Sequence, residues 1–227
     1  MAMRNESSID AQLGGPGSRI LRNSDTPAPR HPDTLLVPLA AFLPRSLANG
    51  PGIRSVLWVQ GCPFRCPGCF NPDFLEFTGG QPTPVETLVT WILARDDTEG
   101  LTFSGGEPFA HAPVLAIVAE QVQREGKSVL IFTGYQKNEL LGSPDPGTRR
   151  LLQSADLLIA GPYRREQPSR HPWLGSTNQE LVFLTERYRR EVAEKGRKRI
   201  EFRIASDGTT SVTGFPRGDD ANTISAP

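Results

Sequence analysis

Ser55-Val-Leu-Trp-Val59 is a short, almost continuously apolar stretch that leads directly into the window Cys62-Pro-Phe-Arg-Cys66-Pro-Gly-Cys69. An apolar run of this length, bounded by turn residues, is typical of a buried strand in a parallel sheet. The window itself cannot form a regular helix or strand, because glycines and prolines interrupt it. We therefore predict a buried strand followed by a loop that carries all three cysteines of the chain.

The cysteine spacing is C-x3-C-x2-C, and the 227 residues contain no fourth cysteine. Thiolates select soft or borderline metals, and iron-sulfur clusters are typically held by four of them. Three ligands, Cys62, Cys66 and Cys69, predict a cluster with one position left open, and loop amides that face sulfur would tune its potential. The alternatives are a zinc site completed by a histidine and cysteines without a chemical role. Zinc sites usually combine two short cysteine pairs, and this chain has no second pair.

A second segment follows a predicted short strand at residues 101–103 and has the sequence Ser104-Gly105-Gly106-Glu107-Pro108. Ligands of α/β proteins bind at strand ends of this kind. The two glycines permit a close approach of the backbone to a ligand, and Glu107 can accept hydrogen bonds from an ammonium group. A bound α-amino group would fit here, although Gly-Gly-Glu taken alone favours an ordinary strand-to-helix turn, and only its pairing with the cysteine loop makes the ligand site the better interpretation.

The cysteine window and this segment together resemble the radical S-adenosylmethionine superfamily. The resemblance implies that Cys62, Cys66 and Cys69 hold a 4Fe-4S cluster whose fourth iron is open to S-adenosylmethionine. It also implies that the cluster cleaves this cosubstrate reductively to methionine and a 5'-deoxyadenosyl radical. The cofactor-binding residues expected from it are Ser104, Gly105, Gly106, Glu107, Pro108 and Thr133, and no catalytic residue is assigned beyond the cluster and cosubstrate.

Within the superfamily, the match is closest to activating enzymes of glycyl-radical proteins, of the anaerobic ribonucleotide reductase type. It covers roughly residues 35 to 185. It rests on the segments Gly50-Pro51-Gly52-Ile53-Arg54, Cys66-Pro67-Gly68-Cys69-Phe70-Asn71, Thr133-Gly134-Tyr135 and Trp173-Leu-Gly175-Ser176-Thr-Asn178-Gln179. Three positions depart from the family pattern, because Asn49 and Glu107 stand where Asp is common and Leu174 where Arg is common.

The composition is that of one ordinary globular domain. The chain has 37% hydrophobic residues and a formal net charge of zero, which gives no sign of a nucleic-acid or membrane surface. We find no secretory signal and no run of roughly 18 apolar residues that could span a membrane. A cytoplasmic location is expected, where cysteines stay reduced.

Strand and helix signals alternate along the chain, which argues for a parallel sheet. Strands are predicted at 55–59, 101–103, 128–132, 156–160 and 180–184, and helices at 83–93, 113–125 and 148–154. A complete eight-unit barrel takes ~250 residues, so we predict an α/β fold in the form of a partial, open parallel barrel of about five or six βα units. Its mouth would collect the cysteine loop, the Gly-Gly-Glu segment and Thr133 at the strand ends.

Three regions are expected. Residues 1–33 have no hydrophobic period and are predicted to be a disordered arm, residues 34–195 the radical S-adenosylmethionine core domain, and residues 196–227 a β-hairpin extension and tail. A charged helix is predicted from Thr185 to about Lys195, and Asp207-Gly208 is typical of a hairpin turn. The segment 161–178 is interpreted as a lid, a docking surface or a tied-down crossover.

Three functions are compatible with these features. The favoured one is an activating enzyme that generates a glycyl radical on a partner protein, with electrons from an external flavodoxin- or ferredoxin-like donor. A second is a radical enzyme that modifies a small molecule or a peptide. The third is a non-catalytic iron-sulfur or zinc-binding module, which leaves the Gly-Gly-Glu segment unexplained.

Overall fold

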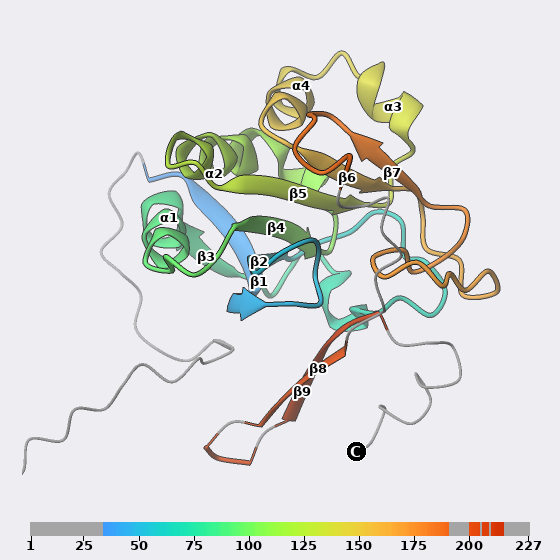
Figure 1. Cartoon of the computed structure of the whole chain (residues 1–227), viewed down its shortest axis with the longest axis horizontal. Coiled ribbons are helices and arrows are strands. Elements are labelled where there is room, and N and C mark those ends of the chain that lie inside the picture. Colours follow the sequence, from blue (N-terminus) through green and yellow to red (C-terminus); the bar gives the residue numbers. More distant parts are fainter. Residues whose placement is uncertain (1–33, 191–199, 205, 209, 216–227) are drawn as a thin grey trace, which may run out of the picture.

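The computed structural model describes residues 34–190, 200–204, 206–208 and 210–215. Its main feature is a seven-stranded sheet with the strand order β3-β1-β2-β4-β5-β6-β7 (Figure 1). The strands are β1 (Leu36–Ser46), β2 (Arg54–Val59), β3 (Gln81–Pro84), β4 (Gly100–Gly105), β5 (Ser128–Thr133), β6 (Leu157–Ala160) and β7 (Glu180–Phe183).

Strands β2, β4, β5 and β6 are parallel neighbours and form the centre of the sheet. Both β1 and β7 run antiparallel to the strands they flank. The predicted α/β class is therefore confirmed, in a mixed sheet that is mostly parallel. The expectation that β7 is one of the parallel strands is wrong, because β7 runs antiparallel to β6, and four strands of the described residues are parallel neighbours. The segment before β7 contains no helix to carry the chain back across the sheet, and a parallel connection usually needs one.

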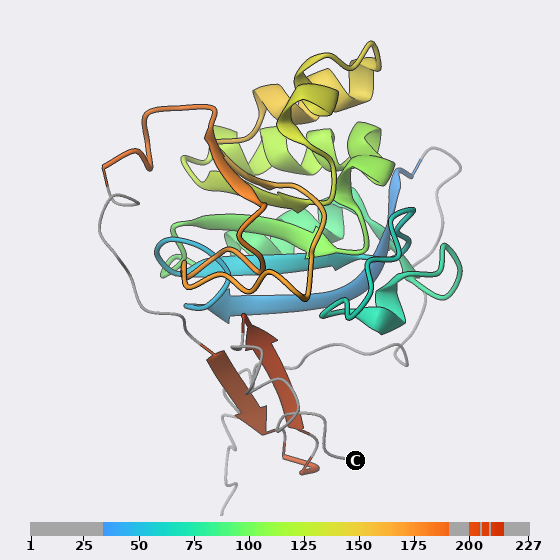
Figure 2. The ribbon, with the colours of Figure 1, turned by 90° about the vertical axis from the view of Figure 1, so that its right-hand side faces the viewer.

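The helices lie over one face of the sheet, and the hairpin described below lies on the other side (Figure 2). They are α1 (Val85–Leu93), α2 (Ala112–Arg124), α3 (Lys137–Leu141) and α4 (Pro146–Gln153), with short 3-10 turns at η1 (Pro72–Phe74) and η2 (Pro108–His111). Helix α1 begins later than predicted, since Pro84 occupies its N-cap and Thr83 lies in β3.

Successive side chains of the central strands point to opposite faces of the sheet, and both faces are apolar. On β2, Leu57 and Val59 join the main core beneath the helices, whereas Val56 and Trp58 pack with Ala41 of β1 in a separate cluster on the opposite face. All of these side chains are at most 8% exposed. Because both faces are covered, the parallel strands are rich in buried apolar residues, as expected for a parallel sheet.

The amino ends of the central strands are joined by a buried arginine. Arg54, at the start of β2, is fully buried, and its guanidinium donates to Thr102 Oγ1 at 2.8 Å and to the Leu101 carbonyl oxygen at 2.6 Å. It also donates to Ser128 Oγ and Tyr188 OH, both at 2.9 Å. One side chain thus ties β2, β4 and β5 to the chain that follows β7.

The hairpin predicted near the C-terminus is confirmed. Strands β8 (Ile200–Ile204) and β9 (Thr210–Gly214) pair antiparallel and project from the body beneath β1 (Figures 1 and 2). The helix predicted from Thr185 is wrong for residues 185–190, which form bends and turns, and its remainder lies outside the described residues, as does the predicted arm at 1–33. No helix in the described part of the chain is long and apolar enough to cross a membrane.

Candidate functional site

The cysteine loop begins where β2 ends and is closed at its base by backbone hydrogen bonds. Gly61 N donates to the Phe74 carbonyl oxygen and Cys62 N to that of Leu75, both at 2.9 Å. Within the loop, Cys69 N donates to the Cys66 carbonyl oxygen at 3.1 Å. The loop therefore folds back on itself, and all three cysteine side chains line one cavity.

Backbone amides donate to the sulfur atoms of Cys62 and Cys69, as expected for a glycine- and proline-rich window. Asn71 N donates to Cys69 Sγ at 3.4 Å, and hydrogen bonds from the backbone of Phe64 and Arg65 lower the pKa of Cys62. Burial has the larger effect and raises the pKa of both the Cys62 and the Cys69 thiols. Without a metal these thiols are protonated at neutral pH, so cluster binding must release their protons.

The Ser104–Pro108 segment follows β4 and packs against the base of the cysteine loop. Gly106 N donates to the Val59 carbonyl oxygen at 2.7 Å, and Glu107 N to that of Gly61 at 2.8 Å. Gly105 has φ +108°, a conformation that favours glycine. A Cβ on Gly106 would lie 2.1 Å from the Gly61 carbonyl oxygen, so only glycine fits between the two loops.

Glu107 joins the ends of β4 and β5. Its side chain is 1% exposed, and its carboxylate accepts hydrogen bonds from Phe109 N at 2.9 Å, Thr133 Oγ1 at 2.9 Å and Gly134 N at 2.8 Å. Burial nevertheless raises its pKa to about 7. The structure therefore gives this carboxylate a positioning role that the sequence did not reveal, in addition to its place in the cavity wall.

The cavity has a volume of about 630 Å³, within the range typical of cofactor sites. It opens at the carboxyl ends of the parallel strands, where Val59 is level with Gly105 and Thr133 with Ala160. The residues predicted from sequence that line it are Cys62, Cys66, Cys69, Ser104, Gly105, Gly106, Glu107 and Thr133. Pro108 is not part of the wall, because it is buried at the start of η2.

Other parts of the wall were not predicted. Tyr163 and Gln179 come from the segment between β6 and β7, where Gln179 Nε2 donates to the Gly161 carbonyl oxygen at 2.9 Å and the Tyr163 ring lies 4.6 Å from that of Phe70. These contacts favour the tied-down crossover among the interpretations of this segment. Asn49 also lines the cavity and is 5% exposed. In the sequence, Asn49 directly precedes Gly50-Pro51-Gly52 and departs from the family pattern, but no place in the site was predicted for it.

The donor set suits an iron-sulfur cluster. The three thiols are partly exposed, share one cavity and have amides nearby.

The comparisons with known proteins agree with this donor set. Residues 48–182 match the family model described as a 4Fe-4S single cluster domain. The anaerobic ribonucleoside-triphosphate reductase-activating protein of Salmonella typhi is 30% identical over 154 residues, which cover 63% of this chain and 96% of that protein. The protein of the same name from Vibrio cholerae is 34% identical over the same shares of both chains.

The chain belongs to this family of activating proteins and, with it, to the radical S-adenosylmethionine superfamily. A more distant member, from Enterobacteria phage T4, is 29% identical over 144 residues, 61% of this chain and 88% of that protein. Among solved structures, QueE from Escherichia coli matches 58% of this chain and 72% of its own with a TM-score of 0.39 and 17% identity, too distant a likeness to carry an argument. Membership of the activating-protein family confirms the resemblance predicted from the cysteine window and the Gly-Gly-Glu segment.

Proposed function

We propose that this protein is a radical S-adenosylmethionine activating enzyme that generates a glycyl radical on a partner protein. The observation that carries the proposal is that the cysteines and the Gly-Gly-Glu segment line one cavity at the strand ends, in a chain of this family. The relatives are named for activating an anaerobic ribonucleoside-triphosphate reductase, and a reductase of that type is the proposed partner.

Cys62, Cys66 and Cys69 are the proposed ligands of a 4Fe-4S cluster with one iron open to S-adenosylmethionine. When bound, the cluster would supply the electron that cleaves the cosubstrate and so initiates hydrogen abstraction from glycine. The loop contributes the thiolates and the surrounding amides, and its backbone closure holds them at the strand ends.

The cosubstrate is proposed to lie against Ser104, Gly105, Gly106 and Thr133, which expose backbone and small side chains to the cavity. Glu107 is proposed to receive its amino group. Oε1 already accepts two hydrogen bonds from the protein, whereas Oε2 accepts one, from Gly134 N, and so has a further acceptor position. The bonds that fix this carboxylate would then orient it toward the ligand.

We propose that the electron comes from another protein. All three cysteines lie in one loop, and the sequence holds no others for a second cluster. A flavodoxin- or ferredoxin-like donor is proposed for this role.

We also propose that residues 34–195 are the core domain and residues 196–227 an extension of it. The sheet is proposed to be a partial barrel that is open between β3 and β7, the two strands that end the sheet order. An opening of this kind would admit a loop of the partner protein to the cavity.

The test is anaerobic reconstitution with iron and sulfide, followed by reduction, addition of S-adenosylmethionine and chromatography for 5'-deoxyadenosine. Product is expected, and electron paramagnetic resonance should then detect a glycyl radical on the reductase. Product without that radical would favour a small molecule or a peptide as substrate. A cluster without product under every donor tried would favour the non-catalytic module.

A further inference from the structure

The C-terminal hairpin turns its polar face toward the protein and its apolar face outward. Along β8 and β9 the less exposed positions are Glu201, Arg203, Ser211 and Thr213, whereas the outward positions Phe202, Ile204 and Val212 are 61%, 77% and 38% exposed. Phe202 is directly opposite Val212 in the register of the hairpin. A hairpin that packs on a core normally shows the reverse orientation, with the apolar face buried.

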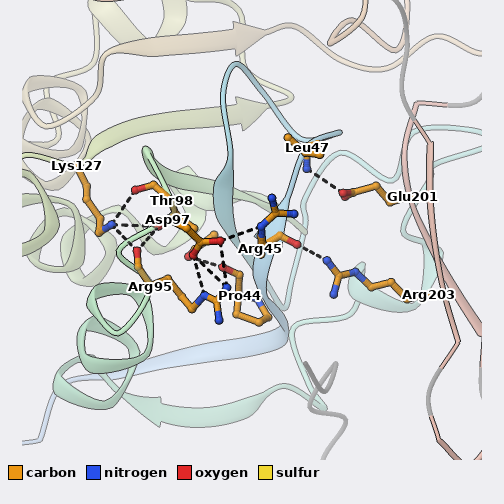
Figure 3. Close-up of polar contacts among 10 residues, drawn as sticks. Pro44, Arg45, Leu47, Arg95, Asp97, Thr98, Lys127, Glu201 and Arg203 are labelled. Atoms are coloured by element: carbon orange, nitrogen blue, oxygen red, sulfur yellow. Dashed lines mark hydrogen bonds and ion pairs between the residues drawn. The ribbon is translucent and has the colours of Figure 1, made fainter. Parts of the chain in front are cut away.

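The polar face is fixed to the end of β1. Glu201 accepts a hydrogen bond from Leu47 N at 2.9 Å, and Arg203 donates to the Arg45 carbonyl oxygen (Figure 3). Glu201 also accepts a hydrogen bond from Ser46 Oγ. Arg45 is in turn bonded to the Asp97 carboxylate, at 2.9 Å. The inward side of the hairpin therefore has hydrogen-bond partners, and its orientation is set by them.

The same face forms one wall of the cavity. Asn49 Nδ2 donates to Thr213 Oγ1 at 2.9 Å, and the Phe215 ring lies 5.2 Å from that of Phe132 and 5.7 Å from that of Phe70. Arg203, Thr213 and Phe215 all line the cavity, as does the partly exposed Val212. The outward apolar surface thus begins at the rim of the cavity.

This outer surface, made of Phe202, Ile204 and Val212, is called here the hairpin apolar face. Clusters of exposed aromatic and aliphatic side chains mark interaction surfaces. The hairpin lies beyond residues 48–182, the part that matches the family model, so it is an addition to the shared domain. An occupant of the hairpin apolar face would be held directly beside the cavity entrance.

We propose that the hairpin apolar face binds the glycyl-radical protein and presents its reacting loop to the cavity. This inference rests on the proposed function. The partner, rather than a second copy, is chosen because the apolar surface is continuous with the rim that the reacting loop has to cross. If a second copy of this chain bound there, the cavity entrances of both copies would lie next to the interface, and neither copy would offer the other a reacting loop.

The test variant is Phe202→Gln/Ile204→Gln, because neither side chain lines the cavity or bonds to the core. Leu141→Gln is the matched control, since Leu141 is 53% exposed on α3, away from the hairpin (Figure 1). Calorimetry would measure the dissociation constant between each reconstituted, unreduced protein and the purified anaerobic ribonucleoside-triphosphate reductase of the same genome. We expect binding to weaken about tenfold or more in the double variant and to stay unchanged in the control.

Equal affinity of the wild type and the double variant would overturn the inference, as would a wild type that does not bind the reductase. Analytical ultracentrifugation provides a further check. A wild-type dimer that is lost in the double variant would overturn the inference and show that a second copy of this chain occupies the hairpin apolar face. Ile204→Gln alone provides a milder variant if the double one misfolds. Formation of 5'-deoxyadenosine is measured separately, in the absence of the partner. If no 5'-deoxyadenosine forms, the proposed function is refuted, whereas the binding measurement alone decides this inference.

Discussion

At the scale of single residues, Glu107 differs most from its expected role. The sequence predicted a carboxylate that waits for an ammonium group, and the structure shows one that is buried and bonded to Phe109, Thr133 and Gly134. Neither the burial nor the partners could be predicted from Gly-Gly-Glu, because they depend on the register of β5 against β4.

Burial of Glu107 predicts a pH effect on stability. Its pKa is raised from 4.5 to about 7, so its contribution to the free energy of unfolding is complete below about pH 4.5 and is lost as the pH rises through about 7. We expect the melting temperature of the cluster-free protein to fall over this window and Glu107→Gln to show a flatter dependence by calorimetry. Glu125→Gln, at an exposed position, is the control. Parallel curves for wild type and Glu107→Gln would contradict the prediction.

Asn49 explains one departure from the family pattern. Its amide donates to Ser46 Oγ at 2.8 Å and to Thr213 Oγ1 at 2.9 Å, and Ser46 Oγ donates onward to Glu201. Asn49→Asp would remove the donor and place a carboxylate near that of Glu201. We expect the free energy that holds the hairpin against the rest of the protein to fall by about 1–3 kcal/mol.

Hydrogen–deuterium exchange would measure this loss as faster exchange in peptides from β8 and β9, with the sheet unaffected. Asn138→Asp, an exposed change on α3, is the control for the added charge. Unchanged protection of the hairpin in Asn49→Asp would show that other contacts hold it.

At the scale of elements, the loops after β2 and β4 fit together through their backbones. Gly106→Ala would place a Cβ 2.1 Å from the Gly61 carbonyl oxygen and force the loops apart. We expect a loss of about 1–3 kcal/mol in urea unfolding and a lower iron content after reconstitution. Gly142→Ala is the control, because Gly142 has a negative φ and its nearest conflicting atom is 3.1 Å away. Full iron content and wild-type stability in Gly106→Ala would mean that the loops adapt.

The opposite ends of the same strands depend on Arg54. Arg54→Leu removes a buried charge and the hydrogen bonds that it donates to Ser128 Oγ, Tyr188 OH and the Leu101 carbonyl oxygen. We expect a loss of about 3 kcal/mol or more in the free energy of unfolding, measured by urea denaturation. Tyr188→Phe, which removes one partner only, should cost less. A larger effect of Tyr188→Phe than of Arg54→Leu would contradict this assignment.

At the scale of the whole molecule, the central strands and the hairpin were predictable because their apolar patterns and turn residues are local. Strand β1 was missed because Pro38 and Pro44 argue against a strand between two neighbours, and irregular register at Leu39–Ala41 and Leu43–Ser46 accommodates its path. The prediction that β7 is parallel to its neighbour was wrong, because an apolar run does not reveal in which direction a strand pairs. In the site, the cysteine positions followed from sequence, whereas the wall formed by the hairpin depends on tertiary packing.

The cluster is expected to stabilise the whole fold, because it would bind the folded loop and not the unfolded chain. Reconstitution should raise the melting temperature of the wild type. Cys62→Ala, Cys66→Ala and Cys69→Ala should each lose both the cluster absorbance and this rise, and full absorbance in all of the variants would contradict the three-cysteine ligation.

The backbone closure of the cysteine loop has a consequence for damage by oxygen. The bonds from Gly61 N and Cys62 N to the η1 region, and from Glu107 N to Gly61, join protein groups only. We therefore expect these bonds to persist when iron is lost and the emptied loop to keep its path. A cell returning to anaerobic conditions would need to supply only iron and sulfide to such a molecule, and could recover the old protein without making it anew.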